Sequence, residues 1–505
     1  MERKVERKQL KSHAGITLVA LVVTIVILII LAVISINIVF GEGGIVKQAE
    51  KAKEHQANAE LEDNEKLGML DNSIKEYING NNSNKEYLDN ELITSPKVSQ
   101  GMIPVYWNGS NWIKTTTDDS KWYNYTNKEW ANIVLEDSTF NGDVLDESKP
   151  YSQLVWIPRF AYKITSGWHS TTTGTVEVVF VGTDNKGKDG TVYNGTYADA
   201  TSGVASGGAM KNYVVEPAFD YGTTKLEGFW IGKYESSHTG CTTDVTTGQT
   251  TFTGNEVMQI KPNVTSWRNI IIGDAFTTCL NMNQANNPYG LNSNDNLVDP
   301  HMVKNTEWGA VAYLSKSKYG KETEEVFINN SSDYITGNAG NTASASSAAG
   351  VINAYNTENG QKASTTGNIY GIYDMSGGAW ERVAAYVNNG HDNLQIYGKS
   401  VVEGTAKYKD VYEQGASDTQ ELNYGKAASK YGDAIYETSN GYSGSGASWY
   451  SDWTDFVGNS NVFFYRGGGY SGAAGAGIFY FGRTYGDGGP NTGTGGGFRV
   501  AVPVL

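Results

Sequence analysis

The chain has 505 residues, 18% of them charged, and a formal net charge of -15. This length allows two or three domains with a sizeable core, and the acidic balance argues against a surface that neutralises nucleic-acid phosphates. Glycine is frequent, at 60 residues, but no Gly-x-y period appears, which excludes collagen. The two cysteines, Cys241 and Cys279, are too few for a disulfide framework.

The amino terminus predicts a membrane anchor. Residues 1–15 form a basic leader, and residues 16–40 contain an apolar run long enough to span a bilayer as a helix. The positive leader should stay in the cytoplasm, which places the C-terminal part outside the cell. A buried soluble helix or a cleaved secretory signal fits so long an apolar run less well. Residues 41–84 then predict a helical stalk and linker, with self-association of the stalk as the alternative.

The junction of leader and apolar run reads HAGITLVAL, from His13 to Leu21. It resembles the processing site of type IV pilin-like precursors. The resemblance implies a bacterial cell-membrane protein, cleaved between Gly15 and Ile16 by a membrane-embedded peptidase. Ala20 departs from the family, because pilins carry at this position a glutamate that is thought to pair with a neighbouring subunit during assembly. Pilin-like self-assembly is therefore an alternative to simple anchoring.

From residue 85 onward the chain changes to short aromatic segments with frequent turn signals. Residues 85–149 predict a small aromatic β element, and residues 150–505 predict one larger domain. Two amphipathic helices are expected at Trp267–Met282 and Asn305–Leu314, the second capped by Thr306. The fold class is therefore α+β with much loop. The predicted strands are Ile103–Trp107, Asn111–Lys114, Ala131–Leu135, Leu154–Ile164, Val176–Val181 and Glu227–Tyr234.

Six short blocks stand in order along the larger domain. They are Leu154–Pro158, Gly228–Glu235, Ser266–Phe276, Asn305–Ala312, Gly371–Glu381 and the closing Arg466–Arg499. In this order they resemble the formylglycine-generating enzyme superfamily, also called sulfatase-modifying factors. The resemblance implies a C-type-lectin-like fold: a compact α+β body with little regular structure and a small central antiparallel sheet.

The enzyme of this family oxidises a substrate cysteine with a pair of reactive cysteines late in the domain. No cysteine follows Cys279 here, so the resemblance does not extend to that pair, and we expect no enzymatic activity. Cys279 lies in an apolar helical pattern and is expected to be a buried small hydrophobe. The histidines have no zinc-ligand spacing. An oxidoreductase is thus the least favoured function, and no catalytic residue is assigned.

Glu381 is the one candidate metal ligand. Members of this family often bind calcium through an Asn, backbone carbonyls and the Glu of a Trp-Glu pair. The pair is present here as Trp380 and Glu381, but Gly378 stands where the Asn is usual. Glu381 is therefore either a calcium ligand or a structural acceptor for the glycine-rich backbone, and no other cofactor is expected.

Two sets of residues are assigned to the scaffold. Arg466 and Arg499 flank the glycine-rich segment, and a guanidinium has five donors with which to hold loop carbonyls. Glycine at this density excludes a helix between them. The tryptophans inside the apolar blocks are expected in the core; they are Trp156, Trp230, Trp308 and Trp380.

The terminal segment between these anchors resembles the variable proteins of diversity-generating retroelements, whose C-type-lectin domains end in a rewritten ligand-binding segment. Aromatic and small polar residues alternate with glycine here, a composition common in recognition loops. Solvated loop residues without a ligand are the alternative. The predicted ligand-binding residues are Tyr450, Ser451, Asp452, Trp453, Tyr470, Ser471, Tyr480, Arg483, Tyr485, Asp487 and Asn491.

We therefore expect a membrane-anchored bacterial surface protein with an extracellular C-terminal domain. Its terminal loops would bind an unknown cell-surface protein or glycan, as an adhesin or a receptor-binding protein does. A minor pilin-like subunit with a chiefly structural head is the alternative.

Overall fold

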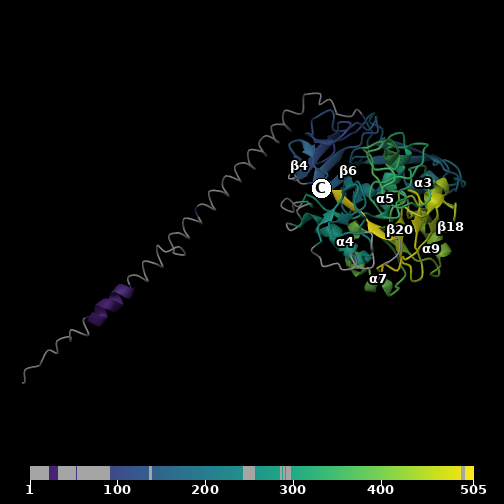
Figure 1. The fold of residues 1–505 in the computed structure, drawn as a ribbon. Helices are drawn as coiled ribbons and strands as arrows, with labels where there is room; N and C mark the ends of the chain where they lie inside the picture. The colour runs from purple at the N-terminus through teal and green to yellow at the C-terminus, as the bar shows by residue number, and fades with distance from the viewer. Residues whose placement is uncertain are drawn as a thin grey trace, which may run out of the picture. The chain divides into compact units, whose positions relative to one another are not determined.

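The chain divides into two units, Met1–Glu86 and Tyr87–Leu505. The larger unit is mixed α+β (Figure 1). The computed structural model describes residues 22–31, 53, 91–135, 139–242, 256–284, 287, 290–291, 297–490 and 495–505.

In the first unit, residues 22–31 are helical and their apolar side chains are exposed. Among the residues that the structure describes, no helix is both long and apolar enough to cross a membrane. The leader, the cleavage pair Gly15 and Ile16, and the stalk apart from Lys53 lie outside the described residues. The anchor, the cleavage and the stalk therefore stay predictions.

The largest sheet of the second unit has nine strands in the order β15-β23-β12-β6-β3-β1-β2-β5-β4, and its neighbouring strands are antiparallel. It is larger than the small sheet expected from the sequence, because it joins strands from both sides of the predicted boundary at residues 149 and 150. Its strands are β1 (Met102–Trp107), β2 (Trp112–Lys114), β3 (Asn132–Leu135), β4 (Phe140–Asn141), β5 (Val144–Leu145), β6 (Ser152–Pro158), β12 (Gly228–Gly232), β15 (His301–Met302) and β23 (Val500–Pro503).

Three segments that are distant in the sequence are neighbours in this sheet. Trp156 of β6 lies opposite Trp230 of β12, and Trp230 lies opposite Val502 of β23. The two tryptophan rings are 5.1 Å apart between centroids. All residues of β6 and β12 are buried, which explains why both segments read as continuous apolar runs rather than alternating ones.

A second sheet of seven strands carries the glycine-rich terminal segment. Its main path is β17-β16-β20-β21-β19-β18, and β22 pairs with β16 in parallel. The sequence analysis predicted none of its strands, because they are short and rich in glycine. They are β16 (Trp380–Asn388), β17 (Asp410–Glu413), β18 (Ser443–Gly444), β19 (Thr454–Asp455), β20 (Phe463–Arg466), β21 (Phe481–Gly482) and β22 (Gly495–Phe498).

The predicted strand Leu154–Ile164 is in fact two strands in different sheets. Pro158 ends β6, since proline has no N–H for a further ladder bond. The next residue, Arg159, donates its backbone N–H to the carbonyl of Glu227, and the chain then enters a three-stranded sheet, β8-β7-β9. The remaining strands are β7 (Phe160–Ser166), β8 (Thr175–Phe180), β9 (Val214–Val215), and the pairs β10 (Asp220–Tyr221) with β11 (Thr224–Lys225) and β13 (Ser237–His238) with β14 (Met258–Gln259).

Both predicted helices exist, with changes at their starts. Helix α4 (Ile272–Leu280) begins later than expected, because Asn269 has a φ of 60°, which no α-helix accommodates. Helix α5 (Asn305–Lys316) is not capped by Thr306: the Glu307 side chain accepts from the Lys304 backbone N–H, and Thr306 donates to Asp410. The other α-helices are α3 (Tyr197–Thr201), α6 (Glu358–Gln361), α7 (Asn393–Ile396), α8 (Lys399–Glu403) and α9 (Gln420–Lys426).

Single 3-10 turns connect many of these elements. Figure 1 shows short helices such as α7 and α9 at the rim of the unit. The long connections between elements agree with the predicted loop-rich character of the domain. The 3-10 turns are η3 (Pro217–Phe219), η4 (Asn281–Asn283), η6 (Ala406–Tyr408), η7 (Ala427–Ser429), η8 (Tyr436–Thr438), η9 (Trp449–Ser451) and η10 (Ala473–Gly475).

The core confirms most of the predicted scaffold residues. Trp156, Trp230 and Trp308 are fully buried, and Cys279 is buried on α4. Trp380 is the exception, because it is only partly buried.

Candidate functional site

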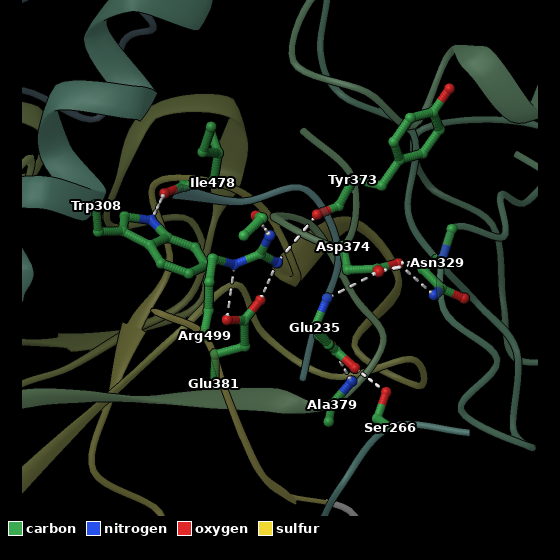
Figure 2. A network of polar contacts seen from close by, with 12 residues as sticks. Glu235, Ser266, Trp308, Asn329, Tyr373, Asp374, Ala379, Glu381, Ile478 and Arg499 are labelled. Carbon is green, nitrogen blue, oxygen red and sulfur yellow. Dashed lines mark hydrogen bonds and ion pairs between the residues drawn. The ribbon is translucent and has the colours of Figure 1, made fainter. Parts of the chain in front are cut away.

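The far end of the terminal segment is fixed by Arg499. Its guanidinium forms a two-point ion pair with the Glu381 carboxylate, and it donates to the carbonyls of Gly232, at 2.7 Å, and Tyr373, at 3.0 Å (Figure 2). Arg499 thus joins β12, β16 and the loop before β16. This agrees with its predicted role as a structural donor to loop backbone.

The near end is fixed by Arg466 and Trp308. Arg466 donates to the carbonyls of Asp433, at 2.8 Å, and Ala434, at 3.2 Å. The Trp308 indole N–H of α5 donates to the carbonyl of Ile478 at 2.8 Å (Figure 2). The segment between the two arginines is therefore held to the domain core at several points.

Three buried carboxyl groups surround the Arg499 site. Asp374 accepts from the Asn329 amide at 2.8 Å, and Glu235 accepts from the Ala379 backbone N–H at 2.8 Å (Figure 2). Burial raises the pKa of Glu235, Asp374 and Glu381. Both oxygens of Glu381 contact Arg499, so its observed role is the structural one. In the described part of the chain, no three His, Cys, Asp or Glu side chains gather as a metal site, and calcium binding stays a prediction.

The loop after β20, which is the first part of the terminal segment, makes a tight turn. Gly468 has a φ of 70°, and a Cβ on it would lie 2.6 Å from the Cα of Ala476, so only glycine fits. Asp452 accepts from the Phe479 backbone N–H at 2.9 Å and is fully buried. Its assignment as a displayed ligand-binding residue is therefore wrong: its carboxylate closes this loop from the inside, and burial raises its pKa.

This loop forms one wall of a pocket of about 210 Å³. The pocket lies between the start of β16, the end of β19 and the residues just before β21. Glycines and Ala476 line it together with three aromatic rings and one carboxylate. The side chains that line it are Trp380, Trp453, Asp455, Ala476, Tyr480 and Thr484.

The aromatic rings of the pocket are supported from behind. A Cβ on Gly469 would lie 3.0 Å from the Trp380 ring, so this glycine packs directly against the indole. Tyr480 is buried, and a Cβ on Gly482 would lie 2.2 Å from its hydroxyl oxygen. Trp453 is 43% exposed, and its backbone N–H donates to the carbonyl of Gly475 at 3.0 Å. The pocket thus has two tryptophan rings that are at least partly exposed and one buried tyrosine ring.

Asp455 supplies the charge in this pocket. Its Oδ1 contacts the Arg483 Nε at 3.4 Å and accepts from the Gln420 side chain. Arg483 also donates to the carbonyl of Gly458 at 3.1 Å. Arg483 therefore braces Asp455 rather than lining the pocket. Burial is the main cause that raises the pKa of Asp455, and Arg483 and Gln420 oppose it.

The remaining predicted ligand-binding residues are not among those that line this pocket. Tyr485 is 49% exposed, and its ring centroid is 6.5 Å from that of Trp380. Ser451 and Ser471 are exposed, and Asp487 is partly exposed. Two tyrosines have structural partners: Tyr450 accepts from Lys316 at 2.8 Å, and the Tyr470 ring packs 4.9 Å from Tyr334. Asn491 lies outside the described residues.

The sequence reasoning missed Trp380 and Asp455 as pocket residues. Trp380 stands directly before a buried block, so it was assigned to the core. Asp455 follows Trp453 at a spacing of two, which on a strand places both side chains on the same face. That spacing was the available signal for Asp455.

A larger pocket, of about 410 Å³, lies near the start of α5. Four lysines line it together with two aspartates. Lys304 is 3.5 Å from Glu307, and Lys407 forms an ion pair with Asp299. Because acidic partners compensate Lys304 and Lys407, and two aspartates also line the pocket, we assign no anion site here. The charged lining residues are Asp220, Lys304, Lys407, Lys409, Asp410 and Lys430.

Neither cysteine is placed for the chemistry of a reactive pair. Cys241 and Cys279 are free, and burial raises the pKa of both thiols. A thiol is nucleophilic as the thiolate, which burial disfavours. No model of a known protein family matches the chain, and no curated protein matches it.

Proposed function

We propose that this chain is a membrane-anchored bacterial surface protein that binds its ligand with the terminal loops of a C-type-lectin-like domain. The observation that carries the proposal is the pocket around Trp453, which the terminal segment lines together with Trp380, Trp453 and Asp455. Trp453 is 43% exposed, and the half-exposed Tyr485 lies near Trp380 of the same pocket; exposed aromatic residues on a held backbone are the usual composition of a recognition surface.

Contacts among five of the six sequence blocks support the C-type-lectin-like fold. The block at 228–235 pairs with the block at 154–158 through β12 and β6. The block at 305–312 contacts the terminal segment through Trp308, and the block at 371–381 contacts it through Glu381. Blocks that resemble one family in sequence thus lie together in one core, as expected if they define a shared fold.

The basic leader and the apolar run of residues 16–40 support the anchor. The resemblance to retroelement-diversified proteins concerns the same terminal loops. A nearly identical template repeat and a reverse transcriptase in the neighbouring DNA would support diversification, and the absence of both would contradict it.

Binding is tested with the full chain, purified in a polyoxyethylene detergent and applied to a panel of glycans and cell surfaces. The double variant Trp453→Ala with Tyr485→Ala should bind at least about tenfold more weakly to the glycan or cell surface that the wild type binds. Exposed aromatic residues at the centre of an interface contribute most of its affinity. Val192→Ala is the matched control, because Val192 is 49% exposed and lies outside the terminal segment.

Near-UV circular dichroism should show that both variants are folded. Equal binding of the folded double variant and the wild type would overturn the proposal.

The minor pilin-like subunit is the second candidate, supported by the HAGITLVAL junction. Recovery of protein cleaved after Gly15 from sheared filaments would favour it, and an uncut, detergent-extracted protein would count against it.

A further inference from the structure

The pocket beside Trp453 has a chemistry that narrows its ligand. Three aromatic side chains, those of Trp380, Trp453 and Tyr480, line it together with the carboxylate of Asp455. Among the described residues that line it there is no lysine, arginine or histidine. The negative faces of aromatic rings and a carboxylate both attract a cation.

The size of the pocket limits what it holds. At about 210 Å³ it is smaller than the sites of roughly 300 Å³ and more that enclose drug-sized ligands. It therefore accommodates one compact group of a larger ligand. The glycines of the lining add no side-chain acceptor, and the carbonyls of Gly469, Gly472 and Gly475 each already accept a backbone N–H.

The hydrogen-bonding capacity of the pocket separates the kinds of cation. An ammonium has three donors and a guanidinium has five, and each needs acceptors when it leaves water. Oδ1 of Asp455 is already engaged by Arg483 and Gln420, which disfavours the two-point contact that a guanidinium makes with a free carboxylate. A quaternary ammonium has no N–H donors and binds to aromatic faces.

We propose that this pocket binds a quaternary ammonium group of the choline type, between the tryptophans and against Asp455. The proposal rests on the proposed function, since it concerns the same terminal loops. The group can come from a phosphocholine-bearing surface or from a trimethylated lysine of a protein. These sources share the same cation and differ in the chain attached to it.

Calorimetric titration of the full chain with choline tests the inference directly, in a polyoxyethylene detergent that carries neither choline nor sugar. The control ligand is 3,3-dimethylbutan-1-ol, which keeps the shape of choline without its charge. Choline should bind about tenfold more tightly than this alcohol. Trp453→Ala should weaken choline binding about tenfold, and Asp455→Asn should weaken choline binding while leaving binding of the uncharged alcohol unchanged.

Arg483→Met should change the affinity for choline in the opposite direction from Trp453→Ala and Asp455→Asn. It removes the cation that now faces Asp455, so choline binding should strengthen or stay equal, whereas a pocket for an anionic ligand would lose affinity. Phosphocholine and trimethyllysine amide, titrated in parallel, distinguish the two sources by which one binds more tightly than choline itself.

Equal binding of choline and the uncharged alcohol would overturn the inference, as would binding of methyl β-glucoside without binding of choline. Both results leave the proposed function intact if Trp453→Ala with Tyr485→Ala still abolishes surface binding. Conversely, choline binding without any recognised surface would contradict the proposed function and retain the cation site.

Discussion

The carboxyl group of Glu437 should make the stability of the domain depend on pH. It is fully buried, and it accepts from the hydroxyls of Tyr162 and Tyr313, each at 2.8 Å, and from the Gly432 N–H at 2.7 Å. Burial raises its pKa from the ordinary value of 4.5 to about 8, with a further contribution from Asp433. Glu437 is therefore largely protonated in the folded protein at neutral pH.

The sign and size of the effect follow from proton linkage. Between pH 4.5 and about 8 the folded state binds a proton that the unfolded chain has released, so the free energy of unfolding falls as the pH rises. The window of about 3.5 pH units, at about 1.4 kcal/mol each, gives a maximum loss of about 5 kcal/mol. Below pH 4.5 the contribution is fully present, and above pH 8 it is lost.

The measurement compares wild type with Glu437→Gln, a neutral side chain of the same shape. Urea unfolding followed by tryptophan fluorescence at pH 5, 6, 7 and 8 should give a shallower pH dependence in the variant, which becomes the more stable protein near pH 8. Burial also raises the pKa of Glu216 and Asp433 next to this site, so these two groups add a pH dependence to the free energy of unfolding of both proteins. The informative quantity is the difference between the two curves.

Glu403→Gln is the matched control, since Glu403 is exposed on α8 and pairs only with the exposed Lys399 among the ion pairs of the described chain. It should leave the pH profile unchanged. If Glu437→Gln also leaves it unchanged, Glu437 is ionised in the folded protein, and the reasoning from burial is refuted.

Two further substitutions test the scaffold. Gly309→Ala should destabilise the domain by about 1–3 kcal/mol, because its Cβ would lie 1.9 Å from the Gly432 carbonyl oxygen. Gly425→Ala on α9 is the comparison: its Cβ meets no atom within 4 Å, so it should stabilise the domain by about 0.5–1 kcal/mol. Thermal unfolding measures both variants, and equal shifts in melting temperature would contradict the packing argument. Arg499→Met should cost about 3–5 kcal/mol, because it leaves Glu381 without its buried partner. Restoring most of that stability with the added change Glu381→Gln would support the ion pair, and no restoration would count against it.

Local patterns predicted the elements more reliably than their pairing. The apolar runs at 154–158 and 228–232 predicted β6 and β12, since strands buried on both faces are apolar on both faces. Nothing in either run indicated that Val502 would lie beside Trp230. Such pairings are set by tertiary packing of distant segments, which a single sequence does not display.

The candidate site was predicted in its location and only partly in its residues. Trp453 and Tyr485 are displayed as expected, whereas Asp452 is buried. A charged residue among glycines reads as surface, but here the unpaired Phe479 N–H needs an acceptor inside the loop, and Asp452 provides it. Trp380 was assigned to the core because it begins a core strand. The glycines beside it carry no side chains and leave space for a pocket, which Trp380 lines.

The placement of β22 and β23 has a consequence for how the protein is made. These consecutive strands pair with β16 in one sheet and with β12 and β15 in the other, so the last segment of the domain joins both sheets. During synthesis neither sheet is complete until this segment has left the ribosome. A chain that stops before it exposes the edges of both sheets, which are sites for aggregation and degradation. Both sheets of the domain are therefore completed only once β22 and β23 have been synthesised.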